Sequence, residues 1–272
     1  MAQRYVRIQS ASGQLHYGLL QADRSVEALD AAPWLGGEVT DRVIPPDTYQ
    51  LLAPCAPSKI IGVGRNYATH AHETQSPLPT EPLLFIKPST TVIPQSATIL
   101  YPPISQQIDY EGELALVIGE RSFACSEAEA ASKIWGYTIA NDVTARDLQR
   151  QDAQWARAKG CDSFCPLGPW LVRELPPDAR LQTFINDGDE PVQSAPVSDM
   201  LFSPTAIVAY ISQAMTLLPG DVILTGTPAG VGPLQIGDRV RIEIEGIGAL
   251  ENRVEARAEY MAQQRLTASA AS

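Results

Sequence analysis

From residue 59 onward, the sequence consists mainly of short apolar segments with the length and composition of β-strands. Helical signals are confined to a few segments, and no regular alternation of strands and helices is visible. This pattern argues against a doubly wound parallel sheet and predicts an α+β fold that is predominantly β. The predicted strands cover residues 59–63, 83–87, 113–118, 136–140, 181–185, 221–224, 240–245 and 250–255.

Three helices are predicted within this β-rich region. Ser126 is expected to cap a helix over residues 126–134, with glutamates near its positive end. Ser203 is expected to precede a second helix over residues 203–215, which has proline at its first position and is stopped by a Pro-Gly pair. A third helix is predicted over residues 144–159.

A change in composition divides the chain near residue 56. The first fifty residues contain two strand-like segments, at 5–9 and 16–20, and lead into a stretch rich in proline. The expected units are a small N-terminal β unit at 1–56, a main domain at 57–260 and a C-terminal tail at 261–272, which frays from residue 267.

The charge of the chain limits its partners. With 20 basic and 31 acidic residues, the net charge is −11, and no Lys/Arg cluster opposes that field. Nucleic acid is therefore not expected as a partner, whereas a small anion remains compatible with a locally reversed potential. The start lacks a signal peptide and the apolar runs are too short to cross a bilayer, so we expect a cytoplasmic protein with no membrane partner.

Four cysteines in a chain of this length do not form a disulfide framework. Cys161 and Cys165 are close enough in sequence to suggest a thiolate metal site, but the three histidines lie far upstream. Buried or incidental thiols are the preferred interpretation.

A pair of acidic residues lies at the start of one predicted strand. Because strand side chains alternate, Glu111 and Glu113 point to the same side, with Gly112 between them. Two carboxylates about 5 Å apart repel by about 3 kcal/mol at an effective dielectric near 20. Solvent exposure, a raised pKa or a bound cation each relieve that repulsion, so an exposed face and a metal site both remain open.

A second polar signal stands where the strand at 136–140 ends, at Asn141 and Asp142. Polar residues at such a point often belong to a site, although Asp142 or Thr144 could instead cap the next helix. Three carboxylate ligands from Glu111, Glu113 and Asp142 suit Mg²⁺ or Mn²⁺, and Ca²⁺ less well.

Three further segments could carry chemistry. His70 and Glu73 are neighbours on a helical turn, where the carboxylate can orient the imidazole as a base; a surface ion pair is the alternative, and His72 is a weaker candidate. Lys159 closes the third predicted helix, where it either meets the helix dipole or holds a substrate carboxylate or enolate. The loop TGTPAGVG at 225–232 lacks the pattern of a P-loop, so it is either a plain turn or an anion pocket.

Taken together, these segments resemble the fumarylacetoacetate hydrolase family, in particular its branch of acylpyruvases and 2-hydroxyhepta-2,4-diene-1,7-dioate isomerases. They occur in the family's order and span roughly residues 58–255. The matching pieces are GRNYATH (64–70), LFIKPST (84–90), DYEGEL (109–114), NDVTARDLQ (141–149), Lys159 with its flanks, and TGTPAGVG (225–232).

The resemblance implies a core of mixed β-roll or sandwich type with a small N-terminal β unit, assembled as a homodimer. Mapped position by position, it implies Mg²⁺ ligands at Glu111, Glu113 and Asp142, with Mn²⁺ or Ca²⁺ as alternatives. It also implies catalytic residues at His70, Glu73 and Lys159, and substrate-binding residues at Arg146, Gln149 and Thr227. The sequence departs from the family at Thr69, where an acidic residue is common, and in a proline-rich segment after Glu73.

The activity expected from this resemblance is Mg²⁺-dependent cleavage of a carbon–carbon bond in an acylpyruvate-type 2-oxo acid, through a metal-bound enolate. Two alternatives on the same site are oxaloacetate decarboxylation or tautomerisation, and isomerisation of a hydroxy-dienoate dicarboxylate. A non-catalytic, metal-stabilised protein that binds a small ligand is the alternative from another class.

Overall fold

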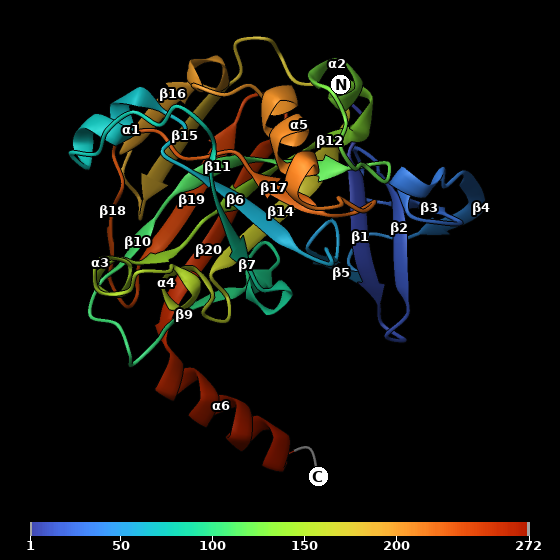
Figure 1. Ribbon diagram of the computed structural model, residues 1–272. Helices are drawn as coiled ribbons and strands as arrows, with labels where there is room; N and C mark the ends of the chain where they lie inside the picture. The colour runs from blue at the N-terminus through green and yellow to red at the C-terminus, as the bar shows by residue number, and fades with distance from the viewer. Residues whose placement is uncertain (1, 271–272) are drawn as a thin grey trace.

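The computed structural model describes residues 2–270 of the chain and is predominantly β, as predicted. Its strands form three sheets, with the helices placed around their edges (Figure 1). Within the described residues, the sheets have twelve, three and five strands. The fold class predicted from the sequence is therefore confirmed.

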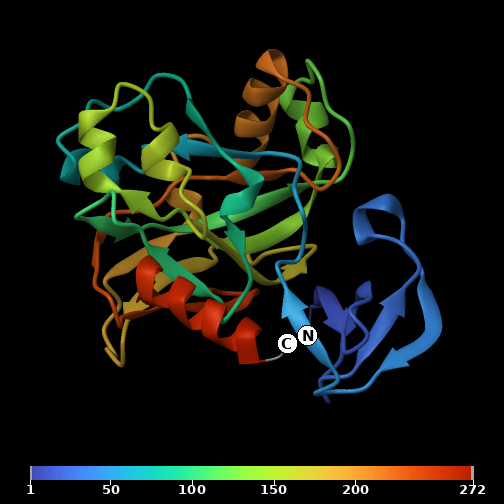
Figure 2. The ribbon, with the colours of Figure 1, turned by 90° about the horizontal axis from the view of Figure 1, so that it is seen from below.

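The N-terminal residues form five of the twelve strands of the largest sheet. Strand β1 pairs antiparallel with both β2 and β5, and Tyr5 in β1 also pairs with Leu171 in β14 of the main body. Figure 2 shows these blue strands standing beside the rest of the molecule. The boundary at residue 56 stays a prediction. The strands of this part are β1 (Tyr5–Ser10), β2 (Leu15–Leu20), β3 (Val26–Leu29), β4 (Val39–Ile44) and β5 (Tyr49–Leu52).

The other seven strands of the largest sheet include the buried centre of the protein. Its strand β11 is buried along its whole length and lies between β12 and β17, both antiparallel to it. Strand β7 forms the edge, next to β6. The strands are β6 (Ile60–Gly64), β7 (Leu83–Lys87), β8 (Val92–Ile93), β11 (Gly112–Ile118), β12 (Ile134–Asn141), β14 (Cys165–Val172) and β17 (Val222–Leu224).

Two smaller sheets pack around this centre. The three-stranded sheet has the order β13-β10-β18 and the five-stranded sheet the order β16-β15-β19-β20-β9. Isoleucine and leucine side chains from all three sheets share one apolar core. The strands are β9 (Thr98–Tyr101), β10 (Ile108–Tyr110), β13 (Thr144–Ala145), β15 (Arg180–Ile185), β16 (Gln193–Pro196), β18 (Gly232–Leu234), β19 (Arg239–Ile244) and β20 (Gly248–Ala256).

Two of the three predicted helices are confirmed. Helix α2 (Glu127–Lys133) begins with a capping box, in which Ser126 and Glu129 each accept a backbone N–H of the other. Helix α5 (Pro204–Ala214) begins after Ser203, whose side chain accepts the N–H of Ala206. Other short helical segments are α1 (Ala68–Glu73) and three 3-10 turns at Pro33–Leu35, Ser89–Thr91 and Val197–Asp199.

The prediction of one continuous helix over residues 144–159 is wrong. The segment divides into β13, α3 (Arg146–Gln151) and α4 (Ala156–Lys159), with Asp152 extended between the helices. A straight helix would separate Arg146 from Lys159 by about 20 Å. Both side chains instead contact the same carboxylate, which requires the chain to turn back between them.

The C-terminal segment is helical rather than frayed. Helix α6 (Arg257–Ala270) follows β20 directly and projects from the body (Figure 1). The expectation of fraying is therefore wrong for residues 267–270, while residues 271–272 lie outside the described residues. No helix in the described part of the chain is both long and apolar enough to cross a membrane.

Candidate metal centre

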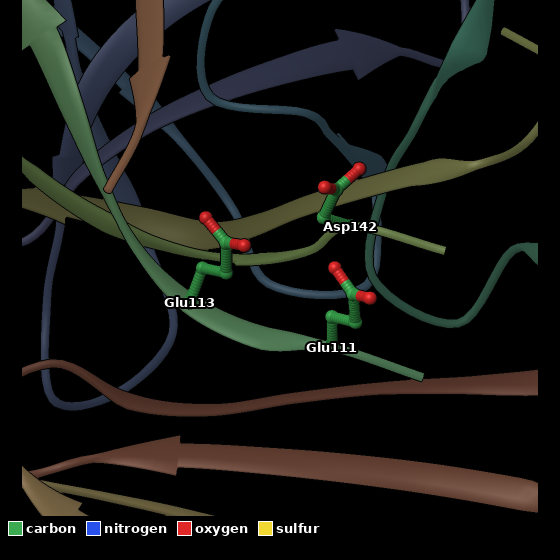
Figure 3. A group of neighbouring side chains, drawn as sticks. All are labelled: Glu111, Glu113 and Asp142. Carbon is green, nitrogen blue, oxygen red and sulfur yellow. The ribbon is translucent and has the colours of Figure 1, made fainter. Parts of the chain in front are cut away.

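The pairing of two strands brings three carboxylates together. Strand β11 pairs antiparallel with β12, with Gly112 opposite Asn141, so Asp142 follows directly beside Glu111. The side chains of Glu111, Glu113 and Asp142 point toward one another (Figure 3), and one oxygen of each lies within 4.8 Å of the others. All three are at most 4% exposed, which excludes the solvent-exposed alternative for the glutamates.

Asp142 does not serve as a helix cap. Helix α3 begins after Ala145, which makes no side-chain capping hydrogen bond. Instead, the backbone N–H of Asp142 donates to the Glu111 carbonyl at 2.8 Å, which ties the two ligand-bearing segments together. Asp142 therefore belongs to the acidic cluster.

Three cationic side chains neutralise part of this cluster. Lys159 Nζ donates to Glu111 Oε2 at 2.8 Å and also to Asp142. Lys87 Nζ donates to Asp142 Oδ1 at 2.6 Å, and Arg146 Nη2 donates to Glu111 Oε1 at 2.6 Å. Burial acts to raise the pKa of Glu111, but the neighbouring Lys159 and Arg146 outweigh it and lower that pKa below its usual range.

Glu113 is left without a cationic partner among the described residues. Its Oε2 accepts one backbone N–H, from Gly226, at 2.7 Å. Burial, together with the charges of Asp142 and Glu111, raises the pKa of Glu113 well above its ordinary value. A buried carboxylate cluster with one member short of positive charge fits a hard divalent cation, which prefers oxygen ligands.

The predicted base lies at the same site. His70 is buried, with 6% of the residue exposed, and its Nδ1 lies 3.3 Å from Glu73 Oε2. The other oxygen of Glu73 accepts the backbone N–H of Gly230 at 3.0 Å. The loop at 225–232 thus supports both Glu113 and Glu73. His72, the weaker candidate, is exposed.

A cavity of about 430 Å³ joins these groups. It is a size suited to a small organic acid. The predicted metal ligands, His70, Lys159, Arg146, Gln149 and Thr227 all line it, together with apolar Val63, Phe85 and Trp155.

The predicted substrate-binding residues are held by their neighbours. Arg146 Nη1 donates to Gln149 Oε1 at 2.6 Å, and Arg146 Nε donates to Asp109 at 2.8 Å. Thr227 Oγ1 accepts Gln193 Nε2 at 2.8 Å. The structure therefore places eight of the nine predicted site residues around one cavity and Glu73 beside His70, while their individual roles stay predictions.

Sequence reasoning missed three supporting residues. Lys87 is a fully buried lysine that ends the apolar strand β7, which is a signal that could have been noticed. Asp109 lies two residues before Glu111 and shares its pattern of alternation. Gln193 carries no signal, because only the fold brings it to Thr227.

Each cysteine carries a free thiol; Cys161 is partly exposed and the other three are buried. Among the described residues, the one group with metal-binding geometry is the acidic cluster. Cys55, Cys125 and Cys165 are thus buried, as the interpretation of buried or incidental thiols expects.

Comparisons with known proteins match nearly the whole chain. The family model described as fumarylacetoacetate (FAA) hydrolase C-terminal matches residues 59–255, and one described as Rv2993c-like, N-terminal, matches residues 3–54. The chain is 40% identical over 224 residues to a Bos taurus protein named oxaloacetate tautomerase FAHD2A, mitochondrial, a match spanning 78% of this chain and 71% of that protein.

Two solved structures are similar over almost their full length. One is a 2-hydroxyhepta-2,4-diene-1,7-dioate isomerase from Mycobacterium marinum, with 42% identity, a TM-score of 0.86 and coverage of 94% of this chain and 99% of that chain. The other is a fumarylacetoacetate hydrolase from Exiguobacterium antarcticum, with 35% identity, a TM-score of 0.82 and coverage of 94% and 100%.

Proposed function

Because the chain belongs to the fumarylacetoacetate hydrolase family, we propose that it is a divalent-metal-dependent hydrolase that cleaves a carbon–carbon bond in an acylpyruvate-type 2-oxo acid. The observation that carries this proposal is that His70, which is buried and paired with the exposed Glu73, lines one cavity together with the acidic cluster. Cleavage of a bond by water needs a positioned general base, whereas a site that only binds an ion needs no base.

Glu111, Glu113 and Asp142 would hold the metal, with Mg²⁺ proposed and Mn²⁺ or Ca²⁺ as alternatives. When bound, the ion supplies Lewis-acid polarisation of the 2-oxo and carboxylate oxygens of the substrate. Arg146 and Gln149 line the same cavity and would orient the substrate carboxylate through planar, charge-assisted hydrogen bonds.

His70 would act as the general base, with Glu73 fixing the ring. His70 removes a proton from water, and the hydroxide oxygen bonds to the distal carbonyl carbon. The bond from that carbon to the neighbouring methylene then breaks, and its electron pair moves to the 2-oxo group to give the pyruvate enolate. The proton held by His70 returns to the methylene carbon, which leaves pyruvate and a carboxylic acid.

Lys159 would stabilise the negative charge that develops on the enolate oxygen. It lies at the acidic cluster with less than 3% of its surface exposed. Although burial acts to lower its pKa, the neighbouring Asp142 and Glu111 raise that pKa, so the ammonium stays charged. A buried, fixed cation of this kind stabilises charge more effectively than water does.

The test is steady-state turnover of acetylpyruvate and fumarylpyruvate, with Mg²⁺ against EDTA, for the wild type, His70→Ala and His72→Ala. His70→Ala should lower kcat/KM by about a hundredfold to ten-thousandfold, the usual contribution of a general base. His72→Ala is the matched control and should retain activity, because His72 is exposed and does not line the cavity. Wild-type turnover by His70→Ala would refute the assignment.

Keto–enol tautomerisation of oxaloacetate is the second candidate, and the similarity to the bovine tautomerase favours it. Isomerisation of a hydroxy-dienoate is favoured in the same way by the Mycobacterium marinum structure. Neither reaction consumes water. Metal-dependent enolisation of oxaloacetate that persists in His70→Ala, without hydrolysis of either acylpyruvate by the wild type, would support the tautomerase.

We propose a homodimer in the cytoplasm as the working form of the enzyme. Light scattering of the purified chain would test the assembly. A monomer at micromolar concentration that keeps full activity would contradict it.

A further inference from the structure

A second cavity lies between the N-terminal strands and the main body. Its volume is about 560 Å³, within the range of small-ligand sites, and it shares no lining residue with the catalytic cavity. One wall comes from residues 4–51, shown in blue in Figure 2, and the other from the loop at 94–97 and from Trp170 in β14. Pockets between structural units are frequent ligand sites.

The lining of this cavity is positively charged in an acidic protein. Arg4 and Arg24 both line it, and none of the described residues that line it is a carboxylate. The chain as a whole carries a net charge of −11. Arg24 is paired with Asp47 at 3.2 Å, but both side chains are more than 70% exposed. This ion pair is therefore weak, and a ligand carboxylate could replace Asp47 as the partner of Arg24.

Arg4 is held in place without using its hydrogen-bond donors. Its guanidinium lies over the Trp170 ring, 4.5 Å from the centroid. The ring is fixed in turn, because Trp170 Nε1 donates to the Ile247 carbonyl at 2.7 Å. The backbone carbonyl of Arg4 accepts the N–H of Leu20 at 2.9 Å. No acceptor for the Arg4 guanidinium is found among residues 2–270.

We propose that this cavity binds a small organic carboxylate, with its carboxylate on Arg4 and its apolar body against Leu20, Leu51 and Trp170. A planar guanidinium matches a carboxylate through two parallel hydrogen bonds. The apolar part of the lining favours a ligand with an apolar body over a fully hydrated ion such as phosphate. This binding site is independent of the catalytic cavity and of the reaction proposed for it.

Isothermal titration calorimetry of the full chain in EDTA tests the site, with benzoate as the probe. Benzoate has no 2-oxo group with which to chelate a metal, and benzamide is its neutral counterpart. Wild type should bind benzoate, and Arg4→Gln should weaken that binding at least about tenfold, the loss of one charge-assisted contact. Arg7→Gln is the matched control, since Arg7 lies three residues further along, within β1, but does not line the cavity, and should stay within about twofold of wild type.

Arg4→Lys is the second variant, in case Arg4→Gln lowers the melting temperature. It keeps the charge but loses the planar fork, so its affinity for benzoate should fall between those of wild type and Arg4→Gln. Three results would each overturn the proposal: no benzoate binding to wild type, equal binding to wild type and Arg4→Gln, or binding of benzamide or inorganic phosphate as tight as that of benzoate.

Discussion

Two buried carboxylates of this protein differ in how completely their charge is satisfied. Asp221 is fully buried and accepts four hydrogen bonds: from Ser58 Oγ at 2.6 Å, from the backbone N–H groups of Lys59 at 3.3 Å and Leu218 at 2.7 Å, and from Lys59 Nζ. Glu113, also buried, has one backbone donor and no cationic partner among the described residues.

This difference distinguishes Asp221, which has a structural role, from Glu113, which is available to bind a ligand. Leaving a buried charge unpaired costs several kcal/mol, so a protein does so only where something else supplies the charge. Asp221 holds the start of β17 against the segment before β6 and needs nothing further. Glu113 stands one strand away, facing two other carboxylates, and a divalent cation would complete it.

Neutralising Glu113 should give the largest effect. We expect Glu113→Gln to abolish metal-dependent turnover, because it removes one of three carboxylate ligands. Without metal, the free energy of unfolding of this variant should equal or exceed that of wild type, since an uncompensated charge is removed. Assays with Mg²⁺ and urea unfolding with EDTA measure both quantities. Glu120→Gln is the control, as Glu120 is an exposed acid paired with Lys133.

Neutralising Asp221 should lower stability but leave activity unchanged, the opposite of the result expected for Glu113. We expect Asp221→Asn to lower the free energy of unfolding by about 3–5 kcal/mol, because Lys59 loses its buried partner. The fraction that remains folded should keep its activity, since Asp221 does not line the catalytic cavity. Urea unfolding with EDTA and active-site titration are the measurements. If Asp221→Asn were stable but inactive, Asp221 would not be a purely structural acid, and the contrast with Glu113 would be wrong.

Metal binding should stabilise the folded protein by a smaller amount. At a Mg²⁺ concentration of about 100 times Kd, we expect about 2.7 kcal/mol of additional stability. The accompanying rise in Tm should disappear in Glu113→Gln and persist in Asp221→Asn, which differential scanning calorimetry would show. If Mg²⁺ raised the Tm of both variants equally, the ion would bind at a site that does not include Glu113.

The smallest effect should come from Ser58→Ala. It removes one of the four donors to Asp221, and we expect a loss of about 1 kcal/mol, the usual net value of a hydrogen bond. Urea unfolding would detect it, with turnover unchanged. A loss as large as that of Asp221→Asn would mean that Ser58, rather than Lys59, holds the carboxylate.

Local rules in the sequence predicted much of the fold. Alternation of side chains placed Glu111 and Glu113 on one side, and capping residues predicted the starts of α2 after Ser126 and of α5 after Ser203. These features depend on neighbours within a few residues, so the sequence alone determines them.

Long-range pairing is what the residues could not reveal by themselves. Asp142 meets Glu111 because β11 pairs with β12 in one register, and Lys87 reaches Asp142 from a strand 55 residues earlier. The break between α3 and α4 follows from the need to bring Arg146 and Lys159 to one carboxylate. The acidic cluster was proposed from the residues themselves, with an exposed face left as the alternative, and the family resemblance supported it, whereas Lys87 and Gln193 were not anticipated.

The most direct test of the account is a crystal of the full chain soaked in Mn²⁺ and measured for anomalous scattering. We predict one strong peak bounded by Glu111, Glu113 and Asp142, with an oxygen of Glu113 in its coordination sphere. A protein that turns over substrate with Mn²⁺ yet shows no peak there, or shows one bound by other side chains, would contradict it.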